Sequence, residues 1–162
     1  VCPHDLGAMA KAILWITADS RYEAYINGKR VGRGPVRYFP TDIFYDAHEV
    51  GHLLRRGEIN TIAVQVMHFG VSNFQYLRER GGLLAQLDVL SGDTEITLAQ
   101  TGADWRTTVH AGQDPAISRM SCQLAFAERI DGRKLAEDWT SAAYSDAVWQ
   151  QSQVIGPARM EP

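Results

Sequence analysis

The chain has little cysteine, no long hydrophobic run and no large excess of either charge. Its 162 residues include two cysteines, Cys2 and Cys122, which fit no metal-binding spacing and are expected to be ordinary thiols rather than a disulfide. No apolar run is long enough to cross a bilayer. The net charge is −3 with both signs interspersed, so we expect neither nucleic acid nor a membrane as a partner.

Internal repeats, low-complexity stretches and linker-like segments are also missing, so we expect one domain over residues 1–162. A chain of this length buries about 70% of its unfolded surface, enough for a core without disulfides or metals. The apolar pattern consists of short strands separated by turn residues. This pattern favours an all-β fold, an antiparallel β-sandwich, over helices or a parallel sheet.

Residues 22–34 carry the clearest local pattern. Asn27-Gly28 lies between two β-prone stretches, at residues 21–26 and 29–32. A two-residue type I′ turn needs positive φ at both central positions, and Asn-Gly adopts that geometry at the least cost. The sequence therefore predicts a tight hairpin here.

Other strands are predicted from their alternation, in chain order at 12–18, 61–68, 83–89, 95–99, 105–109 and 123–129. The most regular of these, 61–68, is expected to be a central strand. Residues 95–99 and 105–109 are expected to pair with each other, and 123–129 to continue the sheet. Residues 139–150 are polar and aromatic, which predicts a turn or a short helix.

Between the hairpin and strand 61–68 lie a tyrosine–aspartate pair, one short helical turn and a glycine stop. The residues of this connector are Tyr45, Asp46, Glu49, Val50, Leu53, Leu54, Gly57, Glu58 and Asn60. Their order resembles the galactose-binding-like jelly roll that lies N-terminal to the catalytic domain of bacterial α-L-rhamnosidases, glycoside hydrolase family 78. Similar pieces follow at residues 103–106, 128–133 and 144–149.

The resemblance implies a non-catalytic accessory domain that is a fragment of a larger multidomain glycoside hydrolase. Its partner would be the catalytic domain of the same polypeptide, with rhamnose-containing glycans as a second partner and no cofactor. An independent carbohydrate-binding module is the alternative function. Residues 34–40 differ from the loop of rhamnose-binding relatives, which weakens the expectation of sugar and calcium binding.

Sugars dock on exposed aromatic rings while charged and amide groups bind their hydroxyls. The candidate carbohydrate-binding residues are Arg37, Tyr38, Phe39, Asp42, Phe74 and Tyr76. Packing against a neighbouring domain is the competing role for all six. The four tryptophans, Trp15, Trp105, Trp139 and Trp149, are expected to pack in the core or at its edge.

One motif suggests a different chemistry. His48-Glu49-Val50-Gly51-His52 matches H-E-x-x-H, which on a helix places two imidazoles on one face for zinc, with the glutamate as general base. A zinc hydrolase is therefore a third hypothesis.

The residues after the motif argue against zinc. Gly57 would end a helix soon after His52, and Glu58 stands where the extended form of the motif needs a third histidine. We therefore interpret His48, Glu49 and His52 as a chance match that holds no metal, with His48 at the surface of the connector.

Acidic residues offer no catalytic centre either. Glycoside hydrolysis needs two carboxylates that flank the scissile bond. The late cluster of Asp131, Glu137, Asp138 and Asp146 lies in turn-like sequence, where solvated carboxylates are expected.

Overall fold

The computed structural model describes residues 11–91, 93–124, 126–134 and 136–156. Its strands are β1 (Lys11–Asp19), β2 (Arg21–Ile26), β3 (Lys29–Gly34), β4 (Asp46–Glu49), β5 (Ile62–Met67), β6 (Gly82–Ser91), β7 (Thr94–Gln100), β8 (Arg106–Thr107) and β9 (Gln150–Gln151). Two short 3-10 helices are η1 (Gly51–Leu53) and η2 (Gly132–Lys134). Neither of these helices could span a membrane, and the described ranges contain none that could.

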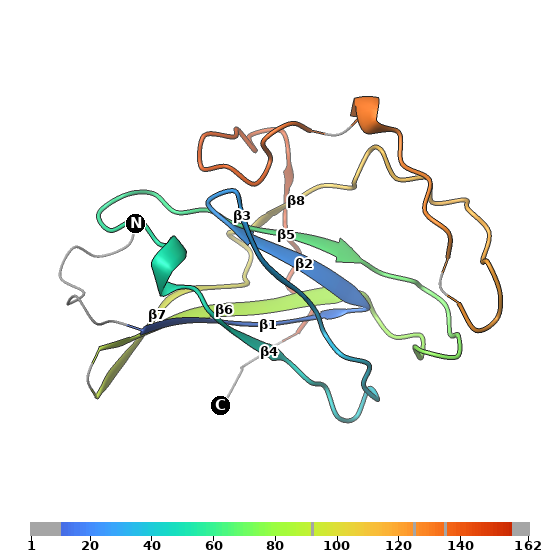
Figure 1. The fold of residues 1–162 in the computed structure, drawn as a ribbon, viewed down its shortest axis with the longest axis horizontal. Coiled ribbons are helices and arrows are strands. Elements are labelled where there is room, and N and C mark those ends of the chain that lie inside the picture. Colours follow the sequence, from blue (N-terminus) through green and yellow to red (C-terminus); the bar gives the residue numbers. More distant parts are fainter. Residues whose placement is uncertain (1–10, 92, 125, 135, 157–162) are drawn as a thin grey trace.

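Two antiparallel sheets pack face to face (Figure 1). One contains four strands in the order β4-β1-β6-β7, and the other contains three in the order β3-β2-β5. β8 and β9 form a separate short ribbon. The arrangement confirms the predicted all-β, antiparallel β-sandwich.

Alternate residues of the strands fill the space between the sheets, because successive side chains of a strand point to opposite faces. Leu14 and Ile16 of β1 are wholly buried, and they lie opposite Leu87 and Ala85 of β6. Ile26 of β2 is wholly buried on the facing sheet. Burying each such large side chain contributes about 1.5–3 kcal/mol, so these positions hold the two sheets together.

The Asn27-Gly28 hairpin forms as predicted, with φ of 50° and 79°. Asn27 also ties the hairpin to the connector: its Nδ2 donates to the Leu53 carbonyl at 2.9 Å and to Asn60 Oδ1 at 2.7 Å. Its Oδ1 accepts from the Thr61 amide at 3.0 Å. One turn residue therefore fixes both the hairpin and the start of β5.

Several predicted pairings are wrong. β5 lies at the edge of its sheet, and β2 is central. β7 pairs with β6, and β8 pairs with β9, so residues 95–99 and 105–109 do not pair with each other. The described residues between 123 and 129 form no strand beyond an isolated bridge, whereas the turns predicted within 139–150 are present. The alternation of apolar and polar residues indicates which face of a strand is buried, but it does not indicate how many strands pair with it.

A buried phenol links the two sheets. Tyr22 of β2 is 3% exposed, and its hydroxyl donates to Asp46 Oδ2 at 2.5 Å. The Tyr22 hydroxyl oxygen also lies 2.9 Å from Nε2 of His48. Asp46 and His48 belong to β4 in the opposite sheet, so this three-residue cluster is a polar bridge across the edge of the sandwich.

Glycines of β3 make room for that bridge. A Cβ on Gly34 would collide with the Asp46 carboxylate, and one on Gly32 would collide with the His48 ring. Neither glycine has positive φ, so the requirement is for space alone. The absence of side chains on β3 therefore lets β4 side chains reach Tyr22.

The close approach at Gly34 can be tested by adding one methyl group. Gly34→Ala should lower the free energy of unfolding by about 1–3 kcal/mol, because its neighbour Asp46 is held by Tyr22 and can move little. Gly132→Ala is the matched control, since a Cβ there meets nothing within 4 Å, and it should stay within about 0.5 kcal/mol. Urea unfolding measures both, and equal losses would contradict the packing described here.

The bridge also predicts a pH dependence. The pKa of Tyr22 is raised far above its usual value, mainly by burial and further by the hydrogen bond to Asp46 and by the negative charge of Asp46. An unfolded tyrosine ionises at about pH 10, so the neutral phenol contributes stability that is complete below that pH and lost as the pH rises further.

Tyr22→Phe should therefore be less stable at neutral pH by about 1–3 kcal/mol, because Asp46 loses its donor. Its stability should nevertheless fall less steeply above about pH 10 than that of the original chain. Urea unfolding between about pH 8 and pH 11 compares the two slopes. Parallel slopes would show that Tyr22 does not carry the alkaline loss.

Candidate functional site

An open groove of about 980 Å³ lies where the edges of the two sheets diverge. The end of β1 and the start of β6 form one wall, and β5 forms the other. Residues 101–108 and parts of 139–156 complete the lining. In Figure 1, the segment that follows β9 passes behind β5 and β6. The groove is thus built from segments that are far apart in the sequence.

A carboxylate oxygen without a hydrogen-bond partner among the described residues lies in this groove. The Asp19 side chain is 15% exposed, and its Oδ2 is buried and accepts no hydrogen bond from the described residues. His68 Nδ1 lies 3.7 Å from that oxygen. A buried carboxylate oxygen in this state can accept a hydrogen bond from a hydroxyl-bearing ligand.

Tyr38 lines the groove beside Asp19. Its hydroxyl donates to the Ala18 carbonyl at 3.3 Å. Burial, and then the negative charge of Asp19, raise the pKa of the Tyr38 phenol. The phenol is therefore neutral at physiological pH and can take part in hydrogen bonding but not in base chemistry.

Aromatic rings form much of the remaining wall, namely Trp105, Trp139, Tyr144 and Trp149. Trp139 packs edge-on against Tyr25 at 5.6 Å, and Trp149 packs against Tyr144 at 5.7 Å. Trp105 donates its indole N–H to the Gln100 carbonyl at 2.8 Å. Each of these three tryptophans therefore has a packing or hydrogen-bond partner and also borders the groove.

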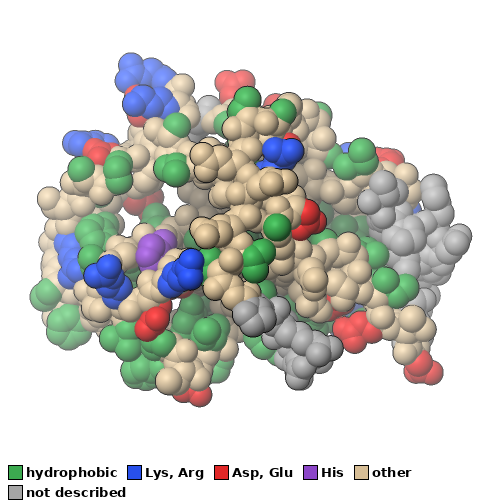
Figure 2. All heavy atoms as spheres, turned by 180° about the vertical axis from the view of Figure 1, so that it is seen from behind, with side chains coloured by type: hydrophobic (Ala, Val, Ile, Leu, Met, Phe, Trp, Pro, Cys, Tyr) green, Lys and Arg blue, Asp and Glu red, His purple; other side chains and the backbone are tan. Residues whose placement is uncertain are grey.

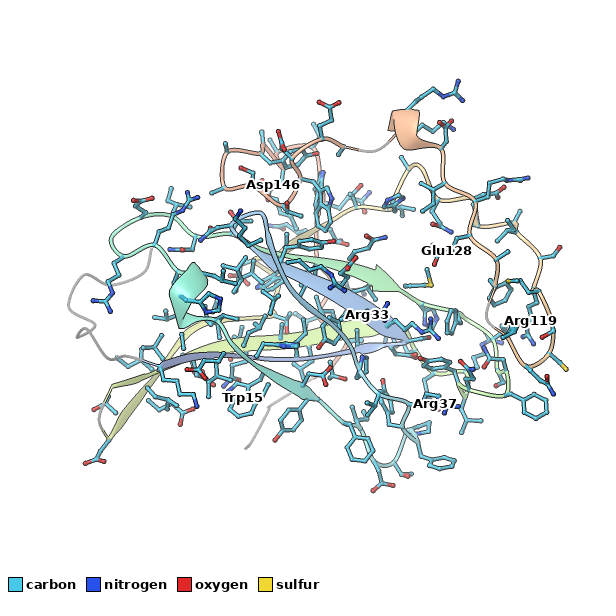
Figure 3. All side chains as sticks on the ribbon, in the orientation of Figure 1. Trp15, Arg33, Arg37, Arg119, Glu128 and Asp146 are labelled. Atoms are coloured by element: carbon cyan, nitrogen blue, oxygen red, sulfur yellow. The ribbon has the colours of Figure 1, made fainter. Side chains whose placement is uncertain are left out.

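Of the six candidate sugar-binding residues, Tyr38 is the one that lines the groove. Arg37, Phe39 and Asp42 lie on the exposed loop between β3 and β4, where the Asp42 amide donates to the Phe39 carbonyl in a turn. Figure 3 shows Arg37 far from Asp146, which lines the groove. The structure therefore does not bring these three residues into the groove.

Phe74 and Tyr76 lie on the connection between β5 and β6. Phe74 is 75% exposed. The Tyr76 ring packs against Phe69 at 4.8 Å, and its hydroxyl accepts from Arg21 Nε at 3.0 Å. Tyr76 is thus held by packing and by Arg21, and Phe74 is the freely presented ring of the pair. Their binding of carbohydrate stays a prediction.

The H-E-x-x-H segment forms a strand followed by a 3-10 helix, where the zinc motif requires one continuous α-helix. His48 faces inward to Tyr22, whereas Glu49 faces outward and pairs with Lys11 at 3.8 Å. His52 is exposed on η1. The expected surface position of His48 is wrong, because Gly32 opens a pocket for its ring.

No cluster of three or more histidine, cysteine or acidic side chains suited to a metal occurs in the described ranges. That the segment holds no metal stays a prediction. Cys122 is an exposed free thiol, and Cys2 lies outside the described residues.

Sequence reasoning missed Asp19 and the groove walls formed by the tryptophans. Asp19 ends a strand and directly precedes the next one, a position typical of a turn aspartate. The sequence contains no local pattern that would have distinguished it. The groove depends on where strands far apart in sequence meet.

Comparison with known proteins finds a family whose sequence model matches nearly the whole chain. Residues 7–161 match the sequence model of the family described as the α-L-rhamnosidase N-terminal domain. An α-L-rhamnosidase of Streptomyces avermitilis is 32% identical over 151 residues, which cover 87% of this chain and 14% of that protein.

Solved structures give the same picture. A family GH78 rhamnosidase of Bacillus sp. GL1 is 50% identical, with a TM-score of 0.87 over 97% of this chain and 16% of its own. The Streptomyces avermitilis enzyme, solved in complex with L-rhamnose, is 30% identical with a TM-score of 0.66 over 92% of this chain and 14% of its own. The chain spans about one seventh of the length of the relatives it matches.

Proposed function

The chain belongs to the family of α-L-rhamnosidase N-terminal domains, and we propose that it acts as a non-catalytic accessory domain of a longer α-L-rhamnosidase-type glycoside hydrolase. The supporting observation is that nearly the whole chain aligns with a small part of each relative. The proposed partner is the catalytic domain of the same polypeptide, on which this domain would pack.

The carboxylates support a non-catalytic role. A glycosidase needs a general acid whose pKa is raised, beside a second carboxylate. A hydrogen bond from the Arg133 side chain lowers the pKa of Asp131. The pKa of Asp114 is lowered mainly by a hydrogen bond from the Ala116 backbone amide, and further by one from the Arg129 side chain. Both oxygens of the buried Asp88 already accept hydrogen bonds from its neighbours. A lowered pKa is the opposite of what a general acid needs, so Asp114 and Asp131 are unsuited to that role.

The isolated 162-residue chain should therefore not hydrolyse an aryl α-L-rhamnoside. The product of the complete reading frame serves as the positive control, and release of the aryl alcohol is the measurement. Turnover by the isolated chain that disappears in Asp19→Asn would contradict the proposal, because Asp19 lines the groove and its Oδ2 accepts no hydrogen bond from the described residues.

We propose contact with rhamnose-containing glycans as a second function, located in the groove. Its support is the unpaired Asp19 oxygen beside Tyr38 and the tryptophan walls, a combination of acceptor and rings that suits a hydroxyl-rich ligand. The relative from Streptomyces avermitilis was solved with L-rhamnose, which suggests the sugar class to test.

Titration of the chain with L-rhamnose and with rhamnose-containing oligosaccharides tests this second function. Asp19→Asn should weaken binding by roughly tenfold or more, the effect of losing a hydrogen bond to a charged group. Phe39→Ala and Phe74→Ala are the controls, because both rings lie outside the groove lining. Loss of binding in these two variants but not in Asp19→Asn would move the site to the loops.

A further inference from the structure

The outer face of the four-stranded sheet carries apolar side chains among its polar ones. Residues of β1 and β6 that point away from the core include Ile13, Trp15, Leu84 and Leu90. An antiparallel sheet with one face in water normally carries polar side chains on that face. All four residues are only half-buried, so this outer face has apolar surface left to cover.

The loop before β4 extends the same apolar surface. The Trp15 and Tyr45 rings meet edge-on at 5.7 Å. Thr17 Oγ1 donates to the Phe44 carbonyl at 2.7 Å, which holds the loop over the face. Ile43 and Phe44 are more than half exposed. Figure 3 shows Trp15 on the side of β1 and β4 that points away from β2.

The C-terminal end of the described chain reaches the same place. A Cβ on Gly82 would lie 2.8 Å from Ile155 Cδ1, so Ile155 packs against the start of β6. Ile155, Ile43, Thr17 and Leu84 all line the groove described above, so the apolar surface continues to its rim. Figure 2 shows hydrophobic side chains gathered at the lower left of the molecule seen from behind. Residues 154–156 therefore lie beside the apolar outer face.

The charged side chains beside Ile13 are already paired. Lys11 and Glu49 form an ion pair at the far edge of the face. Asp88 is 2% exposed and accepts hydrogen bonds from Gln86 at 2.8 Å and Thr97 at 2.7 Å. The part of the face around Ile13 and Trp15 therefore suits an apolar protein partner, because Lys11, Glu49 and Asp88 beside it already have partners.

We propose that the outer face of the four-stranded sheet docks on the polypeptide that follows this domain in the parent glycoside hydrolase. The inference rests on the proposed function, since it supposes a longer chain of the kind that the relatives have. Its own support is the apolar surface together with the path of residues 154–156.

The loop between β3 and β4 and the connection between β5 and β6 form a second exposed surface, which is less suited to docking. Phe39 and Phe74 are the most exposed phenylalanines there, but Arg37 and Arg78 lie close to them in sequence and are also exposed. Charged residues are depleted at the core of stable interfaces. A sheet face is also rigid, so docking on it orders fewer residues.

Hydroxyl-radical footprinting locates the docked surface. The complete reading-frame product and the 162-residue chain are labelled in parallel. Labelling of Trp15 and Ile43 should fall roughly tenfold in the complete product, as expected for side chains that enter an interface core. Phe39 and Phe74 should be labelled equally in both samples.

The other outcomes separate the two proposals. Protection of Phe39 and Phe74 without Trp15 would overturn the docking face and leave the accessory role intact. Equal labelling everywhere would overturn both. Protection of Trp15 in the 162-residue chain that grows with its concentration would identify a second copy as the occupant and overturn the inference.

A variant gives an independent readout. Trp15→Ser should make the link between this domain and the rest of the complete product more sensitive to limited proteolysis. Phe74→Ser is the matched control and should leave the cleavage rate unchanged. Circular dichroism of both variants checks that the sandwich is folded, and equal cleavage in the two folded variants would refute the proposal.

Discussion

The contact between Tyr22 and the β4 side chains Asp46 and His48 constrains much of this sandwich. Two sheets can pack through apolar surface at many relative positions, because hydrophobic burial has no direction. A phenol that must reach both a carboxylate and an imidazole allows far fewer positions. The glycines of β3 are needed for the same contact, so a polar bridge and an absence of side chains together set how β4 lies over the hairpin.

The sequence predicts those parts of the fold that depend on neighbours in the chain. Asn27-Gly28 specifies its own turn through backbone geometry, and the alternation of β1 follows from burial of one face. The edge position of β5 could not be predicted in this way, because it depends on which strand pairs beside β2. His48 was misplaced for the same reason: its environment is made by Tyr22 and Gly32, which are 26 and 16 positions away in the numbering.

Prediction of the candidate site was weaker than prediction of the fold. Exposed aromatic and charged residues on loops are reasonable guesses for sugar contacts, yet just Tyr38 of the six borders the groove. The groove joins the end of β1, the start of β6 and segments near residues 105 and 150. A binding surface assembled from such distant segments has no spacing that a single sequence could display, whereas the family resemblance rests on order along the chain and was confirmed.

The two faces of the four-stranded sheet explain why this domain suits an accessory role. Its inner face carries Leu14, Ile16 and Leu87, which are buried in the core. Its outer face carries Trp15, and the burial there is incomplete. A sandwich whose outer sheet faces only water would gain solubility from polar side chains at such positions. Apolar residues there are instead consistent with a surface completed by another part of a longer polypeptide, and the chain's path past Gly82 leads to that surface.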